Sequence, residues 1–100
     1  MSKVMFSVRY SIVPEKRAEY LTIVKELKSI VKAEGLESYI VFEQKNKQNT
    51  FEEVYLWTNM ESFENSEENV DERVDILTTK LSDLVIEKTT QYTTLVEVVD

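Results

Sequence analysis

Apolar and polar residues alternate near the start of the chain, from Lys3 to Ile12. A period of two is typical of a half-buried β-strand. After Pro14 the period changes, because apolar side chains recur at spacings of three and four. A proline suits the first turn of a helix, so the pattern predicts a helix that begins near Pro14 and is ended by Gly35, the only glycine. Its apolar face is expected to carry Tyr20, Val24, Leu27 and Val31.

Two runs rich in β-branched and aromatic residues, Glu37–Gln44 and Phe51–Thr58, flank a polar segment and predict a β-hairpin. Asn59 is placed to cap a short acidic helix that follows the hairpin. A last strand is expected from Thr89 to Val99. Between the short acidic helix and this last strand lies an amphipathic helical pattern, in which the apolar residues are Val70, Val74, Leu77, Leu81 and Leu84.

The predicted order is therefore strand, helix, strand, strand, helix, strand. This order is the ferredoxin-like βαββαβ arrangement, an α+β fold with a four-stranded antiparallel sheet and two helices on one face. No linker, repeat or low-complexity segment interrupts it. We expect residues 1–100 to form a single domain.

Both helices must cover the same face of this sheet, which leaves the other face for a partner or for water. A face that combines aromatic rings with charges is typical of interfaces and binding sites. We therefore expect two sheets to pack face to face in a homodimer. Alternation assigns to the helix-covered face Val4, Phe6, Val8, Tyr10, Ile40, Phe42, Val54, Leu56, Tyr92, Thr94, Val96 and Val98. It assigns to the open face Ser7, Arg9, Tyr39, Val41, Glu43, Glu53, Tyr55, Trp57, Leu95 and Glu97.

The composition excludes several kinds of catalytic and metal site. The chain has no cysteine and no histidine, which excludes a thiolate metal site, a cysteine nucleophile, and the usual general base, zinc ligand and haem ligand. The formal net charge of −7 argues against a nucleic-acid partner. No stretch approaches the roughly 20 apolar residues of a membrane helix, and the start lacks a signal-peptide pattern. We expect a cytoplasmic protein with no membrane partner.

The stretch Glu53-Val-Tyr-Leu-Trp57-Thr-Asn-Met-Glu-Ser-Phe63 resembles a segment of the antibiotic biosynthesis monooxygenase-like proteins of the dimeric α/β barrel superfamily. In that family a strand ends in Trp and runs into a helix with Glu-Ser/Ala-Phe. Together with strand order and size, the resemblance covers nearly the whole chain. It implies a ferredoxin-like protomer, a dimer whose sheets form a barrel, and a pocket between sheet and helices. Some members oxidise aromatic polyketides or quinols with dioxygen and without a cofactor.

Haem-degrading members of the family use an Asn on the first strand, a Trp on the helix after the third strand, and a His further along. The matching positions in this chain fall near Val8, Ser66 and Ile76, none of which can perform these roles. We therefore reject haem degradation and expect no cofactor.

Four side chains are candidates for binding a planar ligand. Tyr39, Tyr55 and Trp57 would form an aromatic pocket, with Arg9 fixing an anionic group. The alternative is that these rings pack in the dimer and that Arg9 pairs with Glu53 or with Glu43 on the same face, because aromatic and arginine side chains also anchor interfaces.

A fifth candidate, Asn59, would orient a substrate carbonyl at the mouth of a pocket, although its role as a helix cap accounts for it fully. The acidic residues Asp71 and Asp75 lie one helical turn apart, but the segment lacks the ligand spacing and the glycine of a calcium loop. We expect no metal site there and interpret the run as a solvated helix face.

Two functions remain open. The first is a protein that binds a small aromatic or quinol-like molecule without converting it. The second is a cofactor-independent monooxygenase that oxidises a quinol or polyketide-like substrate with dioxygen.

Overall fold

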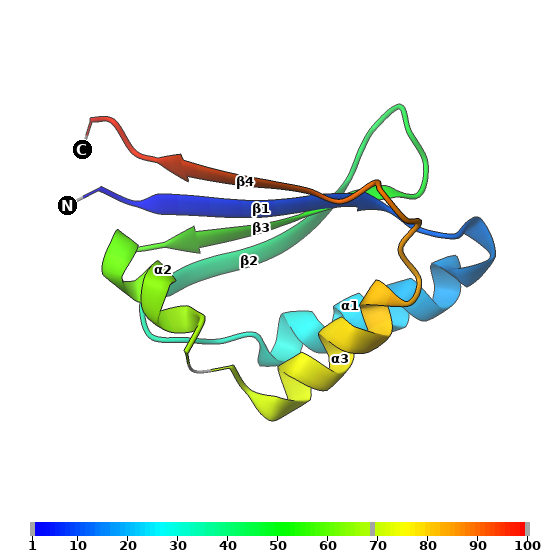
Figure 1. The fold of residues 1–100 in the computed structure, drawn as a ribbon, viewed down its shortest axis with the longest axis horizontal. Helices are drawn as coiled ribbons and strands as arrows, with labels where there is room; N and C mark the ends of the chain where they lie inside the picture. Colours follow the sequence, from blue (N-terminus) through cyan, green and yellow to red (C-terminus); the bar gives the residue numbers. More distant parts are fainter. Residues whose placement is uncertain (1, 69, 100) are drawn as a thin grey trace.

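The computed structural model describes residues 2–68 and 70–99. Its elements are β1 (Val4–Ser11), α1 (Arg17–Ile30), β2 (Leu36–Glu43), β3 (Thr50–Trp57), α2 (Met60–Ser66), α3 (Glu72–Ser82) and β4 (Gln91–Val96). The four strands form one antiparallel sheet in the order β2-β3-β1-β4. All three helices lie on the same side of it (Figure 1). The predicted α+β, ferredoxin-like fold is confirmed.

The first helix is shorter than the sequence pattern predicts. Pro14–Lys16 form a 3-10 turn, and α1 then ends at Ile30, because Val31 has an extended backbone. The prediction that Gly35 ends this helix is wrong. Gly35 instead forms part of the turn into β2, where its φ of 83° lies in the left-handed region that glycine tolerates best.

The second helical region is divided into two helices, so the sheet face carries three helices and not two. The side-chain oxygen of Asn59 accepts a hydrogen bond from the backbone N–H of Ser62 at 2.8 Å, which confirms the predicted cap of α2. The carboxylate of Asp71 accepts hydrogen bonds from the backbone N–H groups of Arg73 and Val74 and caps α3 in the same way. Each cap fixes a separate helix start.

The register of the strands corrects the predicted faces of β2 and β3. Tyr55 lies opposite Phe6 of β1 and opposite Tyr39 of β2, and Glu53 lies opposite Val8. Residues that lie opposite one another point to the same side of a sheet. The helix-facing side therefore carries residues that the alternation placed on the open face, namely Tyr39, Val41, Glu43, Glu53, Tyr55 and Trp57. The open face instead carries Ile40, Phe42, Val54 and Leu56, whereas β1 and β4 have the predicted orientation.

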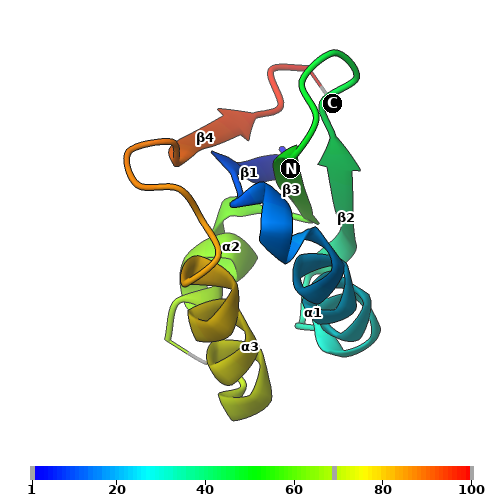
Figure 2. The same cartoon turned by 90° about the vertical axis from the view of Figure 1, so that its right-hand side faces the viewer.

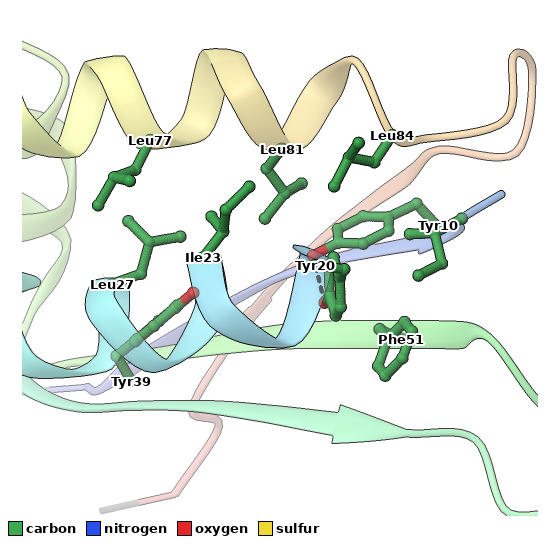
Figure 3. Close-up of a cluster of buried hydrophobic side chains, with 10 residues drawn as sticks. Tyr10, Tyr20, Ile23, Leu27, Tyr39, Phe51, Leu77, Leu81 and Leu84 are labelled. Carbon is green, nitrogen blue, oxygen red and sulfur yellow. Dashed lines mark hydrogen bonds between the residues drawn. The ribbon is translucent and has the colours of Figure 1, made fainter. Parts of the chain in front are cut away.

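The core lies between the helix-facing side of the sheet and the pair α1 and α3, which run side by side beneath it (Figure 2). The rings of Tyr20 and Phe51 pack in a tilted arrangement with centroids 4.3 Å apart, and Tyr10 packs against Tyr20 (Figure 3). Apolar side chains of the two helices fill the rest of the space, namely Ile23, Leu27, Leu77 and Leu81. Among the described residues no helix is long and apolar enough to cross a membrane.

Candidate functional site

A buried carboxylate lies within the helix-facing side of the sheet. Glu53 is only 6% exposed. The Tyr10 hydroxyl donates to its Oε2 at 2.7 Å, and the Tyr39 hydroxyl donates to its Oε1 at 2.7 Å. The Tyr55 hydroxyl lies 3.4 Å from Oε1, and the Tyr20 hydroxyl lies 2.8 Å from that of Tyr10. We call these five residues the Glu53 cluster.

Three of the four hydroxyl protons of the cluster, those of Tyr10, Tyr39 and Tyr55, point toward the Glu53 carboxylate. Because Tyr10 donates its proton to Glu53, the hydrogen bond between the two tyrosines runs from Tyr20 to Tyr10. None of the salt bridges among residues 2–68 and 70–99 involves Glu53. A carboxylate buried without a cation depends on such hydrogen bonds for its stability. The tyrosines therefore replace the solvent that the carboxylate has lost.

The four phenols of the cluster are held in their protonated form. Burial raises the pKa of Tyr10, Tyr39 and Tyr55, and the negative charge of Glu53 raises it further. Burial also raises the pKa of Tyr20. A phenol with a raised pKa gives up its proton less readily, so these groups act as hydrogen-bond donors. Within the cluster, the Glu53 carboxylate accepts hydrogen bonds and donates none.

Aromatic rings from four elements meet next to this cluster. The Phe6 ring lies 5.9 Å from that of Tyr55, 5.4 Å from that of Phe63 on α2, and 6.1 Å from that of Tyr92 on β4. The Trp57 ring lies 6.3 Å from that of Phe63. We call these five residues the aromatic wall. Tyr92 is 70% exposed, and Phe6, Tyr55 and Phe63 are half-buried, so part of the wall is open to solvent.

Trp57 combines burial with an unused hydrogen-bond donor. Its side chain is 5% exposed, and its Nε1 has no hydrogen-bond partner within the described residues. A buried donor without an acceptor costs about 1–3 kcal/mol. The aromatic wall therefore contains a buried polar donor that has no acceptor among the described residues.

The five predicted site residues do not form a single pocket. Tyr39, Tyr55 and Trp57 share the helix-facing side, whereas Arg9 lies on the opposite face. The grouping of Arg9 with the three aromatic residues is therefore wrong.

The predicted ion pairs of Arg9 are also wrong. Its guanidinium donates to Glu52 from Nε at 3.2 Å and from Nη2 at 3.0 Å. Glu43 pairs with Arg17 at 2.6 Å, and Glu53 lies on the other side of the sheet. Arg9 and Glu52 are opposite one another in the register of β1 and β3, which explains the pair that forms.

Asn59 stands apart from the other candidates. It lines a cavity of about 500 Å³ between α2 and the end of α1, together with polar residues such as Lys32, Glu34, Ser62 and Asn65. None of the other four candidates lines this cavity. Its side-chain oxygen is already engaged as the cap of α2. A ligand contact at Asn59 remains a prediction.

Across residues 2–68 and 70–99, no three His, Cys, Asp or Glu side chains come together as a metal site. The family positions for haem degradation fall on Val8 in β1, Ser66 at the end of α2, and the exposed Ile76 on α3.

Sequence reasoning recognised Glu53 only as a partner for Arg9 and missed its role as the centre of a cluster. The sequence did contain a signal. Glu53, Tyr55 and Trp57 follow one another at a spacing of two, so they share one face of a strand. Tyr10 and Tyr39 occupy the facing strands, and once the register is known they lie within reach of this row.

Comparisons with known proteins give one family and one fold. The family model described as antibiotic biosynthesis monooxygenase matches residues 3–71. A search of curated proteins found no match. A conserved protein from Methanosarcina mazei Go1 superposes with a TM-score of 0.79 at 19% identity, covering 95% of this chain and 92% of that one. Rv0793 from Mycobacterium tuberculosis superposes with a TM-score of 0.78 at 11% identity, covering 98% of this chain and 97% of that one. SnoaB, a cofactor-independent oxygenase from Streptomyces nogalater, superposes with a TM-score of 0.72 at 16% identity, covering 95% of this chain and 92% of that one. At these identities the structural likeness shows a shared fold.

Proposed function

The chain belongs to the antibiotic biosynthesis monooxygenase family, and from that premise we propose that it binds a small aromatic, quinol-like molecule against the aromatic wall. The wall supplies rings from β1, β3, α2 and β4, and part of this surface is open to solvent. Aromatic rings bind planar ligands by offset stacking and edge contacts, which add to the burial of apolar area. A planar molecule of one or two rings suits this surface.

The observation that carries the proposal is the unpaired Nε1 of Trp57 beside these rings. A ligand oxygen that accepts this proton would remove the cost of the buried donor. Small-molecule sites commonly combine apolar walls with a few polar groups that fix orientation. Trp57 supplies such a group, whereas Arg9 is on the wrong side of the sheet to do so.

Isothermal titration calorimetry with 2-naphthol tests the proposal directly. We expect binding by the wild-type protein, and we expect Trp57→Phe, which keeps a ring but lacks the N–H, to weaken it by roughly three- to thirtyfold. Arg9→Lys, on the opposite face, is the control and should bind as the wild type does. If naphthol does not bind, or if Trp57→Phe binds equally well, the proposed site is incorrect.

A second candidate function is cofactor-independent oxygenation of a quinol with dioxygen. It is favoured by Glu53, because this carboxylate beside the wall offers a proton acceptor in a chain that has no histidine. SnoaB, which has a similar fold, is a cofactor-independent oxygenase. Oxygen uptake with a hydroquinone under air should exceed the uncatalysed rate and should fall in Glu53→Gln. Uptake at the uncatalysed rate would leave ligand binding as the function.

We also propose that two copies pair through the open face of the sheet. This face exposes apolar side chains that water solvates poorly, with Ile40 at 40%, Phe42 at 53% and Leu95 at 51% exposure. A second copy would cover them. Light scattering should give the mass of a dimer for the wild type and that of a monomer for Phe42→Glu. A wild-type monomer at micromolar concentration would refute the pairing.

A further inference from the structure

A groove between α1 and α3 opens to solvent on the side of the helices that faces away from the sheet. It encloses about 500 Å³ and is lined by residues of these two helices, namely Glu19, Thr22, Ile23, Glu26, Arg73, Leu77 and Lys80. Its floor is apolar, because Ile23 and Leu77 are 6% and 2% exposed. No residue of the Glu53 cluster or of the aromatic wall lines it, so the groove is separate from the candidate site.

The charges of the groove are sorted by helix. Its two acidic residues, Glu19 and Glu26, are on α1, and its two basic residues, Arg73 and Lys80, are on α3. In each pair the two residues are seven positions apart, which is about two helical turns and about 10 Å. The helices run in opposite directions (Figure 1). Arg73 therefore lies across from Glu26, to which it is paired at 2.7 Å, and Lys80 lies toward Glu19.

The end of the groove that carries Glu19 and Lys80 is charged and open. In the part of the chain that the structure describes, neither side chain belongs to an ion pair, and both residues are exposed. Ile76 is 41% exposed and follows Arg73 by three positions, so it adds apolar surface beside the basic row. An apolar centre within a charged rim is the usual composition of a protein interface.

A two-fold axis along the groove makes this pattern complementary to itself. Rotation about that axis places α1 of a second copy over α3 of the first and leaves every residue at the same position along the groove. Each acidic row then faces a basic row, with Glu26 opposite Arg73 and Glu19 opposite Lys80. A two-fold axis across the groove would place α1 over α1 and bring like charges together. The charges therefore favour one isologous arrangement.

We propose that this groove is a self-association surface, on which a second copy of the chain docks through its own α1 and α3. The surface is distinct from the open face of the sheet, so two dimers formed through that face could associate further by their helices. Copies with a formal net charge of −7 repel one another overall. In the groove, however, two carboxylates and two cations cancel, so a second copy can approach there.

The size of the surface predicts a weak association. Two packed helices of 14 and 11 residues present a face of roughly 20 Å by 20 Å. This is about half of the roughly 800 Å² that each partner buries in a standard interface. Opposite charges at such a surface contribute more to the choice of partner and orientation than to affinity. We therefore expect the association at high protein concentration.

Sedimentation velocity in a Phe42→Glu background tests the proposal, because this substitution disrupts the open face and does not touch the groove. The background should change from monomer to dimer between about 10 μM and 1 mM. Lys80→Glu and Glu19→Lys, each added alone, place like charges opposite one another twice in the dimer and should weaken the association roughly tenfold or more. Lys25→Glu makes the same change of charge on α1 outside the groove and is the matched control.

An equimolar mixture of the Lys80→Glu and Glu19→Lys variants gives the sharpest result. In the mixed dimer the new lysine of one copy faces the new glutamate of the other, and the two unchanged charges also face one another. The mixture should therefore recover the association of the background, which a defect in the folding of either variant would not produce. A mixture that stays monomeric would overturn the proposal, as would an equal effect of Lys25→Glu. A background that is monomeric at about 1 mM would also overturn it, and is expected if the groove binds a helix of a different protein.

Discussion

Replacing Tyr10 with phenylalanine should destabilise the protein more than any other removal of a single hydroxyl from the Glu53 cluster. The substitution deletes a 2.7 Å hydrogen bond to a buried carboxylate, and bonds to charged groups contribute about 1.5–3 kcal/mol. It also leaves the Tyr20 hydroxyl, which is buried, without the oxygen to which it donates. An unsatisfied buried donor costs about 1–3 kcal/mol. The expected loss is therefore about 2.5–6 kcal/mol of unfolding free energy.

The order of effects is a sharper test than the size of any one of them. Tyr20→Phe removes only a bond between two neutral hydroxyls, so it should cost about 1 kcal/mol. Tyr39→Phe removes one bond to the carboxylate without stranding a donor and should cost about 2 kcal/mol. In the Tyr10→Phe background, Tyr20→Phe should restore stability, because it removes the stranded hydroxyl.

Urea denaturation followed by circular dichroism at one fixed protein concentration measures these differences, since the stability of a dimer depends on concentration. The double-mutant cycle should give a coupling energy of at least about 1 kcal/mol between the two hydroxyls. The proposed chain of hydrogen bonds, in which Tyr20 donates to Tyr10 and Tyr10 donates to Glu53, is wrong if Tyr10→Phe lowers the unfolding free energy no more than Tyr20→Phe does. It is also wrong if the two losses of unfolding free energy are additive.

Three further expectations concern other parts of the fold. Gly35→Ala should lower the unfolding free energy by more than roughly 2 kcal/mol in chemical denaturation, because the residue has a positive φ and an added Cβ would collide with the Ser62 side chain. A loss below about 0.5 kcal/mol would contradict that close approach. The hydrogen bond from Arg17, helped by the Asn49 backbone N–H, lowers the pKa of Glu43 from 4.5 to about 2, so its stabilisation is present above pH 4.5 and is lost as the pH falls toward 2. Arg17→Met should flatten that part of a stability curve measured across pH, and an equally steep curve would refute the pair's role. The raised pKa values of the four cluster tyrosines stabilise the fold below about pH 10, and this contribution is lost at higher pH; tyrosinate absorbance from the cluster should therefore appear only together with unfolding.

The order of the elements could be predicted from the sequence because each element has its own period and its own cap. The alternation in β1 identifies its buried face without ambiguity, since Ser7 and Arg9 interrupt the apolar residues. Asn59 precedes a helix and caps it as expected. These signals are local, and local patterns survive folding when no tertiary contact opposes them.

The faces of β2 and β3 could not be predicted in the same way. Both strands carry apolar or aromatic residues on each side, as in Val54-Tyr55-Leu56-Trp57, so alternation gives no direction. Polarity then predicts the wrong face, because a glutamate is not expected in a core. Glu53 is accommodated there only because tyrosine hydroxyls from three strands donate hydrogen bonds to it. The site therefore depends on register, which a single strand does not encode.

The convergence of several donors on one carboxylate also limits the order in which evolution can dismantle the cluster. Exchange of Glu53 for an apolar residue strands the hydroxyls of Tyr10 and Tyr39 at once, whereas loss of the Tyr20 hydroxyl strands no donor. A tolerated mutational path can therefore begin at Tyr20, whereas Glu53 and the phenols that donate to it have to change together, because loss of the phenols leaves a buried carboxylate without donors. Such coupling makes the carboxylate and its donors exchangeable only in concert, so descendants of this chain would keep or lose them as a set.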